Sequence, residues 1–173
     1  VLAGQAEAAN VVVAEGVISS DERVAVKSKV SLPIRRMPVH EGSALRRGEL
    51  LVEMQNDVQR AGVEAAKAEI QRARSALAEA ELAHKIAVRE FDRNSFLRRE
   101  DVITDKDLDL SRDAVQVTEA TLKTRQEELA KAEAQLAVAQ AVYEDTLIRA
   151  PFDGLVSRLY LRVGDTPREA DTV

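Results

Sequence analysis

Apolar side chains recur every seven residues along two stretches of the chain, both within residues 55–146. An apolar repeat held over five or six heptads is typical of coiled-coil helices. No proline interrupts either stretch, Gly62 is the only glycine, and good helix formers such as Ala, Glu and Lys are frequent. The pattern therefore predicts two helical arms of about 40 residues, each about 60 Å long. The repeat positions are Val63, Ile70, Leu77, His84 and Phe91 in the first arm and Leu108, Val115, Leu122, Leu129, Leu136 and Tyr143 in the second.

The link between the arms is short and contains helix-capping residues. The first arm extends to about Arg99, and a turn near Asp101 follows it. Thr104 fits the N-cap of the second helix, with Asp107 at the third helical position in a variant of the capping box. Because so short a link leaves no other path, we expect the arms to lie antiparallel.

The register of the hairpin is predicted by pairing residues whose numbers have a constant sum, here about 202, because two antiparallel arms run in opposite directions. This register sets a large side chain against a small one in six layers, which fills a thin seam efficiently. Three further layers are more polar, and we expect them to be softer. The six layers are Ala66–Leu136, Ala73–Leu129, Ala80–Leu122, Ala87–Val115, Ile70–Ala132 and Val63–Ala139, and the polar layers are Leu77–Arg125, His84–Thr118 and Phe91–Ser111.

The segments that flank the arms are extended and resemble each other. An offset of 122 residues brings Ile34 onto Val156 and Gly42 onto Gly164. We therefore expect an α+β fold, in which a long antiparallel helical hairpin is inserted between the two halves of one small β unit. Alternating apolar residues between turn residues predict the strands, which lie within residues 11–30 and at residues 34–39, 50–54 and 155–161.

Composition narrows the functions that the chain can have. With 3% aromatic residues and no Trp among 173 residues, it is poor material for a large globular core and good material for thin helical pairs. The net charge of -5 and the absence of a concentrated basic face argue against nucleic-acid binding. No apolar run is long enough to span a membrane, and the first residues do not resemble a signal peptide. These observations fit either a processed product or a cytosolic protein.

The polar residues do not form a recognisable reactive site. His40 and His84 lie far apart without further ligands at metal-binding spacing, and the absence of cysteine excludes disulfides and thiolate metal sites. The acidic residues near the turn lack the glycine and the terminal Glu of a calcium loop, and their place in the first turn of a helix is explained by the helix dipole. We therefore predict no catalytic residue, no cofactor and no metal. The acidic residues are Glu100, Asp101, Asp105, Asp107 and Asp109.

Two segments of the β unit resemble a known family. Residues 39–51, with the sequence VHEGSALRRGELL, are similar to the first half-motif of a biotinyl/lipoyl-like domain, and residues 148–156, IRAPFDGLV, are similar to the second. In this combination the chain resembles the HlyD-like membrane fusion proteins, also called periplasmic adaptor proteins, over about residues 16–173. Leu32-Pro33 departs from the family, which usually has Gly before the Ile, so we expect the first strand to begin differently there.

The resemblance extends to the turn of the hairpin. The family's tip motif is Arg, three residues, Leu, six residues and Ser, and Arg93, Leu97 and Thr104 stand at this spacing with Thr in place of Ser. Each residue also has an ordinary explanation: a solvated charge, a residue closing the seam and a helix cap. The resemblance implies that the three dock onto a TolC-like outer-membrane channel.

The family also implies an overall role and a division of the chain. The role is that of a non-enzymatic periplasmic adaptor, which assembles into a ring, usually a hexamer, and holds an inner-membrane transporter of the RND or ABC type. A segment outside this chain would attach it to the inner membrane. The implied division is residues 1–23 leading from a β-barrel domain, 24–54 and 147–173 as the two halves of the lipoyl-like domain, and 55–146 as the hairpin.

Two other classes fit parts of the pattern. A biotin or lipoyl carrier subunit requires a modifiable Lys in the tight turn between the two halves, where this chain has about 90 residues of predicted helix. A covalent cofactor on Lys27 or Lys29 would favour that class. A cytosolic coiled-coil scaffold would require neither the tip residues nor the matched flanks.

Overall fold

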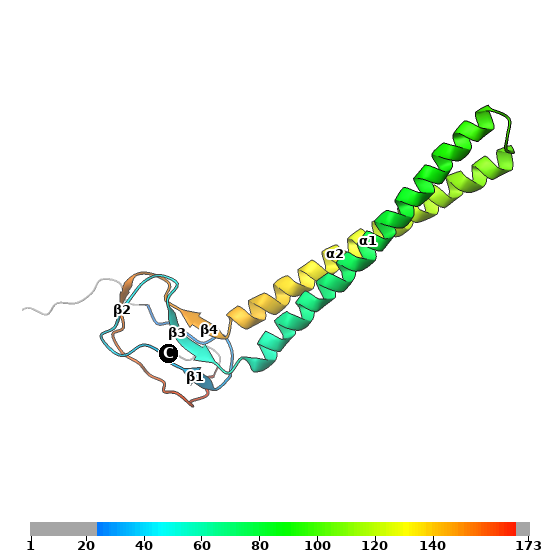
Figure 1. Ribbon diagram of the computed structural model, residues 1–173. Helices are drawn as coiled ribbons and strands as arrows, with labels where there is room; N and C mark the ends of the chain where they lie inside the picture. Colours follow the sequence, from blue (N-terminus) through cyan, green and yellow to red (C-terminus); the bar gives the residue numbers. More distant parts are fainter. Residues whose placement is uncertain (1–23, 169–173) are drawn as a thin grey trace, which may run out of the picture.

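The computed structural model describes residues 24–168, so the predictions made for residues 1–23 and 169–173 lie outside the described residues. Two long helices project side by side from a small β unit (Figure 1). The predicted fold class, a long antiparallel hairpin inserted between the two halves of a β unit, is confirmed. The elements are β1 (Ile34–Arg36), β2 (Ala44–Leu45), β3 (Leu50–Met54), α1 (Asp57–Arg99), α2 (Asp105–Glu144), β4 (Leu147–Arg149) and β5 (Gly154–Leu155).

The β unit draws on both flanks of the hairpin. Antiparallel strands in the order β1-β3-β4 form one sheet, and β2 pairs with β5 in a second. Each sheet therefore joins a strand from before the hairpin to one from after it, as Val52 opposite Ile148 illustrates. In the place where a carrier domain has its tight turn, this chain has α1 and α2. The buried core residues are Ile34, Val39, Leu51, Val52, Met54, Ile148 and Ala150.

The two halves are related by a reciprocal set of hydrogen bonds. The amide of Gly42 donates to the carbonyl of Val156 (2.8 Å), and the amide of Gly164 donates to the carbonyl of Ile34 (2.9 Å). Both glycines have positive φ, +83° and +96°, a conformation that strains most other residues. The predicted equivalence of Ile34 and Val156 is thus confirmed. The return bonds run from Val156 to Ser43 (3.0 Å) and from Ile34 to Asp165 (2.8 Å).

The strands are shorter than their sequence pattern suggested. The strand predicted for residues 34–39 ends with β1 at Arg36, and the one predicted for 155–161 is reduced to β5. The prediction of strands in residues 24–30 is wrong for the described part, which contains only an isolated bridge at Lys27. Outside the strands, the extended segments are held by a few backbone hydrogen bonds between residues far apart in the sequence, as between Gly42 and Val156, and the local sequence pattern does not record them.

The helices meet along the predicted seam. His84 Nδ1 lies 3.2 Å from Thr118 Oγ1, which confirms that polar layer of the register. Leu129 packs against a buried cluster that contains Ala73, in agreement with the predicted register, and the direct contact between Leu129 and Ala73 stays a prediction. Ala80 is buried, and its contact with Leu122 stays a prediction. The cluster consists of Ile70, Ala73 and Ala132, with the half-buried Leu129 and Leu136 packed against it.

Ion pairs join the base of the hairpin to the β unit. Lys29 Nζ lies 2.5 Å from Asp145 Oδ1 at the end of α2, and Arg35 Nη1 lies 3.0 Å from Asp57 Oδ1 at the start of α1. Each pair connects a residue that precedes β3 in the sequence to one end of a helix. Exposed pairs contribute little stability individually, and these two lie at the two ends of the hairpin's base, one on each helix.

Candidate docking tip

The first helix ends in a backbone arrangement known as the Schellman motif. The amide of Asp101 donates to the carbonyl of Arg98 (3.1 Å), and the amide of Val102 donates to the carbonyl of Leu97 (2.9 Å). Asp101 has φ of 55°, in the left-handed region where glycine is the usual residue. The chain therefore reverses at Asp101, where the turn was predicted.

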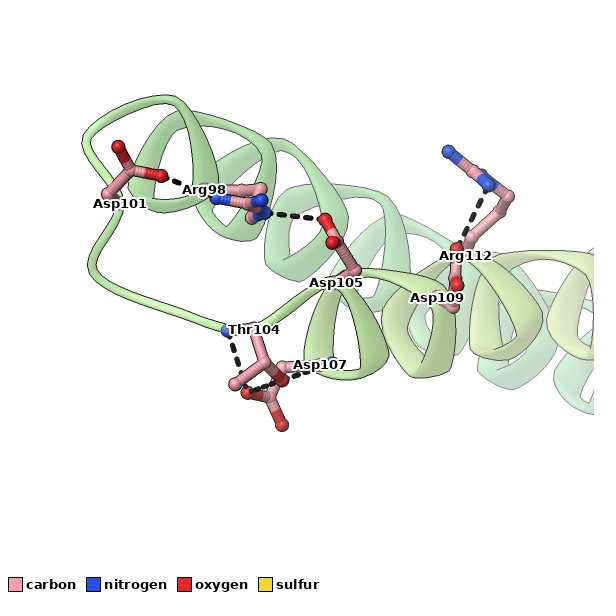
Figure 2. A network of polar contacts seen from close by, with 7 residues as sticks. All are labelled: Arg98, Asp101, Thr104, Asp105, Asp107, Asp109 and Arg112. Atoms are coloured by element: carbon pink, nitrogen blue, oxygen red, sulfur yellow. Dashed lines mark hydrogen bonds and ion pairs between the residues drawn. The ribbon is translucent and has the colours of Figure 1, made fainter.

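The second helix begins with a complete capping box. The amide of Asp107 donates to Thr104 Oγ1 (3.2 Å), and the amide of Thr104 donates to Asp107 Oδ2 (3.1 Å) (Figure 2). The Thr104 hydroxyl also donates to Asp107 Oδ2 at 2.7 Å. These hydrogen bonds from Thr104 hold the pKa of the Asp107 carboxyl below its usual value, because they favour its charged form. The predicted N-cap and its variant capping box are confirmed.

Arg98 bridges the turn, a role that was not predicted from the sequence. Its Nε donates to Asp105 Oδ1 and its Nη1 donates to Asp101 Oδ1, both at 2.6 Å (Figure 2). The hydrogen bonds that Arg98 donates to Asp105 and Asp101 raise the pKa of Arg98, and the bond to Asp105 lowers the pKa of that carboxyl. The three-residue spacing to Asp101 was visible in the sequence, but the bond to Asp105 joins two helices and depends on the turn.

The three predicted tip residues have different surroundings. Arg93 is exposed and forms an ion pair with Glu90 on the same helix, Leu97 is half-buried, and Thr104 is the exposed cap. Leu97 and Thr104 flank the turn, and Arg93 lies one helical turn before Leu97. Within residues 24–168, no hydrogen bond or ion pair links these three side chains to one another. Their joint role in docking stays a prediction.

Two exposed apolar side chains at the tip were also missed. Phe96 is 56% exposed and Val102 is 65% exposed. Phe96 lies on the last turns of α1, with the guanidinium of Arg99 6.0 Å from its ring centroid, and Val102 lies in the turn itself. Side chains of this size at the end of a projection offer apolar contact area to a partner.

Known proteins resemble this chain in sequence and in fold, although no family model matches it. The multidrug resistance protein MdtA of Escherichia coli O45:K1 (strain S88 / ExPEC) is 26% identical over 157 residues, which cover 91% of this chain and 34% of MdtA. MacA from Actinobacillus actinomycetemcomitans superimposes with a TM-score of 0.76 and 24% identity, over 86% of this chain and 46% of MacA. The membrane fusion protein Spr0693 from Streptococcus pneumoniae R6 superimposes with a TM-score of 0.56 and 20% identity, over 86% of this chain and 59% of that one.

The chain is similar in sequence to MdtA and in fold to MacA and Spr0693, which agrees with the resemblance to the membrane fusion, or periplasmic adaptor, proteins. The predicted resemblance to this family is thereby confirmed, and adaptors of this family are generally not enzymes. The chain spans about a third of the length of the curated relative that it matches (34%).

The described residues outside the tip carry few features of other kinds of site. Within residues 24–168, no group of three or more His, Cys, Asp or Glu side chains could hold a metal ion. No helix in that range combines the length and apolar character of a membrane span. A hollow of about 510 Å³ runs along the hairpin, but its lining is charged or small, unlike the apolar walls of most small-molecule sites. Its lining residues include Glu69, Arg72, Ala73, Arg125, Glu128 and Lys131.

Proposed function

We propose that this adaptor bridges an inner-membrane transporter and a TolC-like outer-membrane channel in an efflux or secretion system. The observation that supports the proposal is the hairpin, a projection of about 60 Å that leaves a small β unit and ends in a closed, capped turn. In the proposed arrangement the adaptor lies in the periplasm, attached to the inner membrane by a segment outside this chain. The transporter, of RND or ABC type, supplies the energy, and the adaptor supplies spacing and a sealed path.

Self-association into a ring, a hexamer in the usual form of the family, is part of the same proposal. Apolar side chains on the helix faces away from the seam support it, because surfaces of this kind commonly mark protein contacts. On α1, Leu82 is 57% exposed and Ile86 is 44% exposed; on α2, Val117 and Val138 are each 65% exposed. Copies placed side by side would cover these side chains and form a tube of hairpins.

Docking by the tip is the step that the proposal assigns to Arg93, Leu97 and Thr104. Arg93 carries several donors that can reach carbonyl or carboxylate groups of a partner, and its side chain is 65% exposed. Leu97 adds apolar contact one helical turn away. Thr104 has a structural role as the cap, so its part in docking must be separated from its part in folding.

The test is the charge reversal Arg93→Asp, measured by substrate efflux from cells. We expect efflux to be lost while helical content and melting temperature are kept, since an exposed charge change rarely alters the free energy of unfolding by more than about 0.5 kcal/mol. Arg72→Asp is the matched control, because Arg72 pairs with Glu69 three residues earlier on the same helix, away from the tip. Thr104→Ser keeps the cap and should be nearly silent.

A stable Arg93→Asp protein with full efflux would refute the docking role. Loss of efflux in Arg72→Asp as well would point to a general effect of charge reversal on the hairpin. Measuring the mass of the intact protein tests the carrier alternative separately, since a covalent cofactor on a lysine adds a defined mass. Of the two candidate lysines, Lys29 forms an ion pair with Asp145.

A further inference from the structure

Among the side chains drawn in Figure 2, Arg98 is the one whose hydrogen bonds connect the two helices across the turn. Its guanidinium donates to Asp101 in the turn and to Asp105 in the first turn of α2, each at 2.6 Å. The Arg98 side chain is 33% exposed, whereas those of Asp101 and Asp105 are 87% and 80% exposed. The cation is therefore the sheltered member of the group, and its planar fork matches two separate carboxylates.

The backbone of the turn adopts a conformation that its sequence does not favour by itself. Asp101 has φ of 55°, which an L-residue adopts less readily than glycine does. Arg98 holds Asp101 twice, through its carbonyl, which accepts the Asp101 amide, and through its side chain, which pairs with the carboxylate. Just two residues, Val102 and Ile103, separate this point from the Thr104 cap.

The carboxylates at the turn repel one another, and the positive charge of Arg98 offsets part of this repulsion. Glu100, Asp101, Asp105 and Asp107 place four carboxylates within eight consecutive residues. Like charges so close together repel each other, and Arg98 is the residue that neutralises Asp101 and Asp105 together. By contrast, Arg112 pairs with Asp109 within α2 and lies 5.9 Å from the ring centroid of Phe91 on α1, so its contacts cross the seam but not the turn (Figure 2).

We propose that Arg98 is a positioning residue for docking, which bridges Asp101 and Asp105 and so holds the turn in one arrangement before a partner binds. The inference rests on the proposed function, because it concerns how the tip is presented to the channel. A preformed turn binds more tightly than a mobile one, since less conformational freedom is lost on binding. Leu97 and Thr104, at either end of the turn, would then meet the partner already in place.

The first experiment needs no partner. Amide hydrogen exchange is compared between the wild-type protein, as the cell expresses it, and the variants Arg98→Gln and Arg112→Gln. In Arg98→Gln we expect the amides of Val102 and Asp107, which are bonded within the turn and the cap, to exchange at least about tenfold faster because local opening becomes easier. Arg112→Gln removes one positive charge from the same end of the hairpin and should leave these amides unchanged.

The second experiment measures docking to a purified TolC-type channel in detergent. We expect Arg98→Gln to weaken binding by about fivefold or more, mainly through faster dissociation, and Arg112→Gln to bind as the wild type does. Adding Asp101→Gly to Arg98→Gln should restore most of the affinity, because glycine adopts the left-handed conformation readily and removes one of the repelling carboxylates. A residue that contacted the channel directly would not be rescued in this way.

The outcomes separate this inference from the function on which it rests. Unchanged exchange in Arg98→Gln overturns the positioning role, whatever the binding shows. Faster exchange with undiminished binding also overturns it, provided that Arg93→Asp abolishes binding and so upholds tip docking. If Arg93→Asp binds the channel normally, tip docking itself fails and the positioning role fails with it. Faster exchange, weaker binding and rescue by Asp101→Gly together support the inference.

Discussion

The stability of the hairpin should depend on its few buried seam residues, and Ile70→Ala tests this directly. Ile70 is 6% exposed and packs with Ala73 and Ala132. The substitution removes three carbon atoms, worth about 2.4 kcal/mol at about 0.8 kcal/mol each. Core truncations of this size cost about 2–5 kcal/mol, with the larger costs where a cavity persists. A seam between two helices can close or admit water, so we expect a loss of about 2–3 kcal/mol in the free energy of unfolding.

The assay is urea unfolding followed by far-ultraviolet circular dichroism, at concentrations where the protein is monomeric. Ile70→Val should cost about 0.5–1.5 kcal/mol and gives an intermediate point. Leu82→Ala is the matched control, because Leu82 lies on the same helix but is 57% exposed, and we expect it to change stability by less than about 0.5 kcal/mol. If Ile70→Ala cost no more than Leu82→Ala, the reasoning that the seam cluster stabilises the hairpin would be refuted.

Two further predictions concern a glycine inside α1 and the capping box of α2. Gly62→Ala should raise the free energy of unfolding by about 0.5–1 kcal/mol, since Gly62 lies inside α1 with nothing within 4 Å of an added Cβ; a loss of stability in urea unfolding would contradict this. The capping box should make stability dependent on acid, because hydrogen bonds from Thr104 lower the pKa of Asp107 below its usual 3.8. The contribution of the Asp107 carboxylate to the free energy of unfolding is therefore complete above that value and lost as pH falls through the lowered pKa. An NMR titration of the Asp107 carboxyl checks the direction of the shift. Asp107→Asn should remove this part of the acid dependence.

The sequence by itself determined the hairpin and its caps, because the forces that form them act over short distances along the chain. A heptad repeat records which side of a helix is buried, so the seam that contains Ile70 and Leu129 could be recognised without coordinates. The capping box joins Thr104 to Asp107, three residues away, and is equally local. The likeness between the two flanks could also be found, because an offset of 122 residues is a property of the sequence alone.

The tertiary structure decided which distant residues meet. It therefore decided the lengths of the strands and the contacts of Arg98 with Asp101 and Asp105 at the tip. β2 and β5 end where their pairing with each other, from opposite sides of the hairpin in the sequence, ceases, and no local alternation records that point. Arg98 reaches Asp105 because Asp101 takes a left-handed conformation and brings the two helix ends together. A periodic pattern specifies the face that a residue occupies, whereas contacts across a turn depend on how the backbone closes.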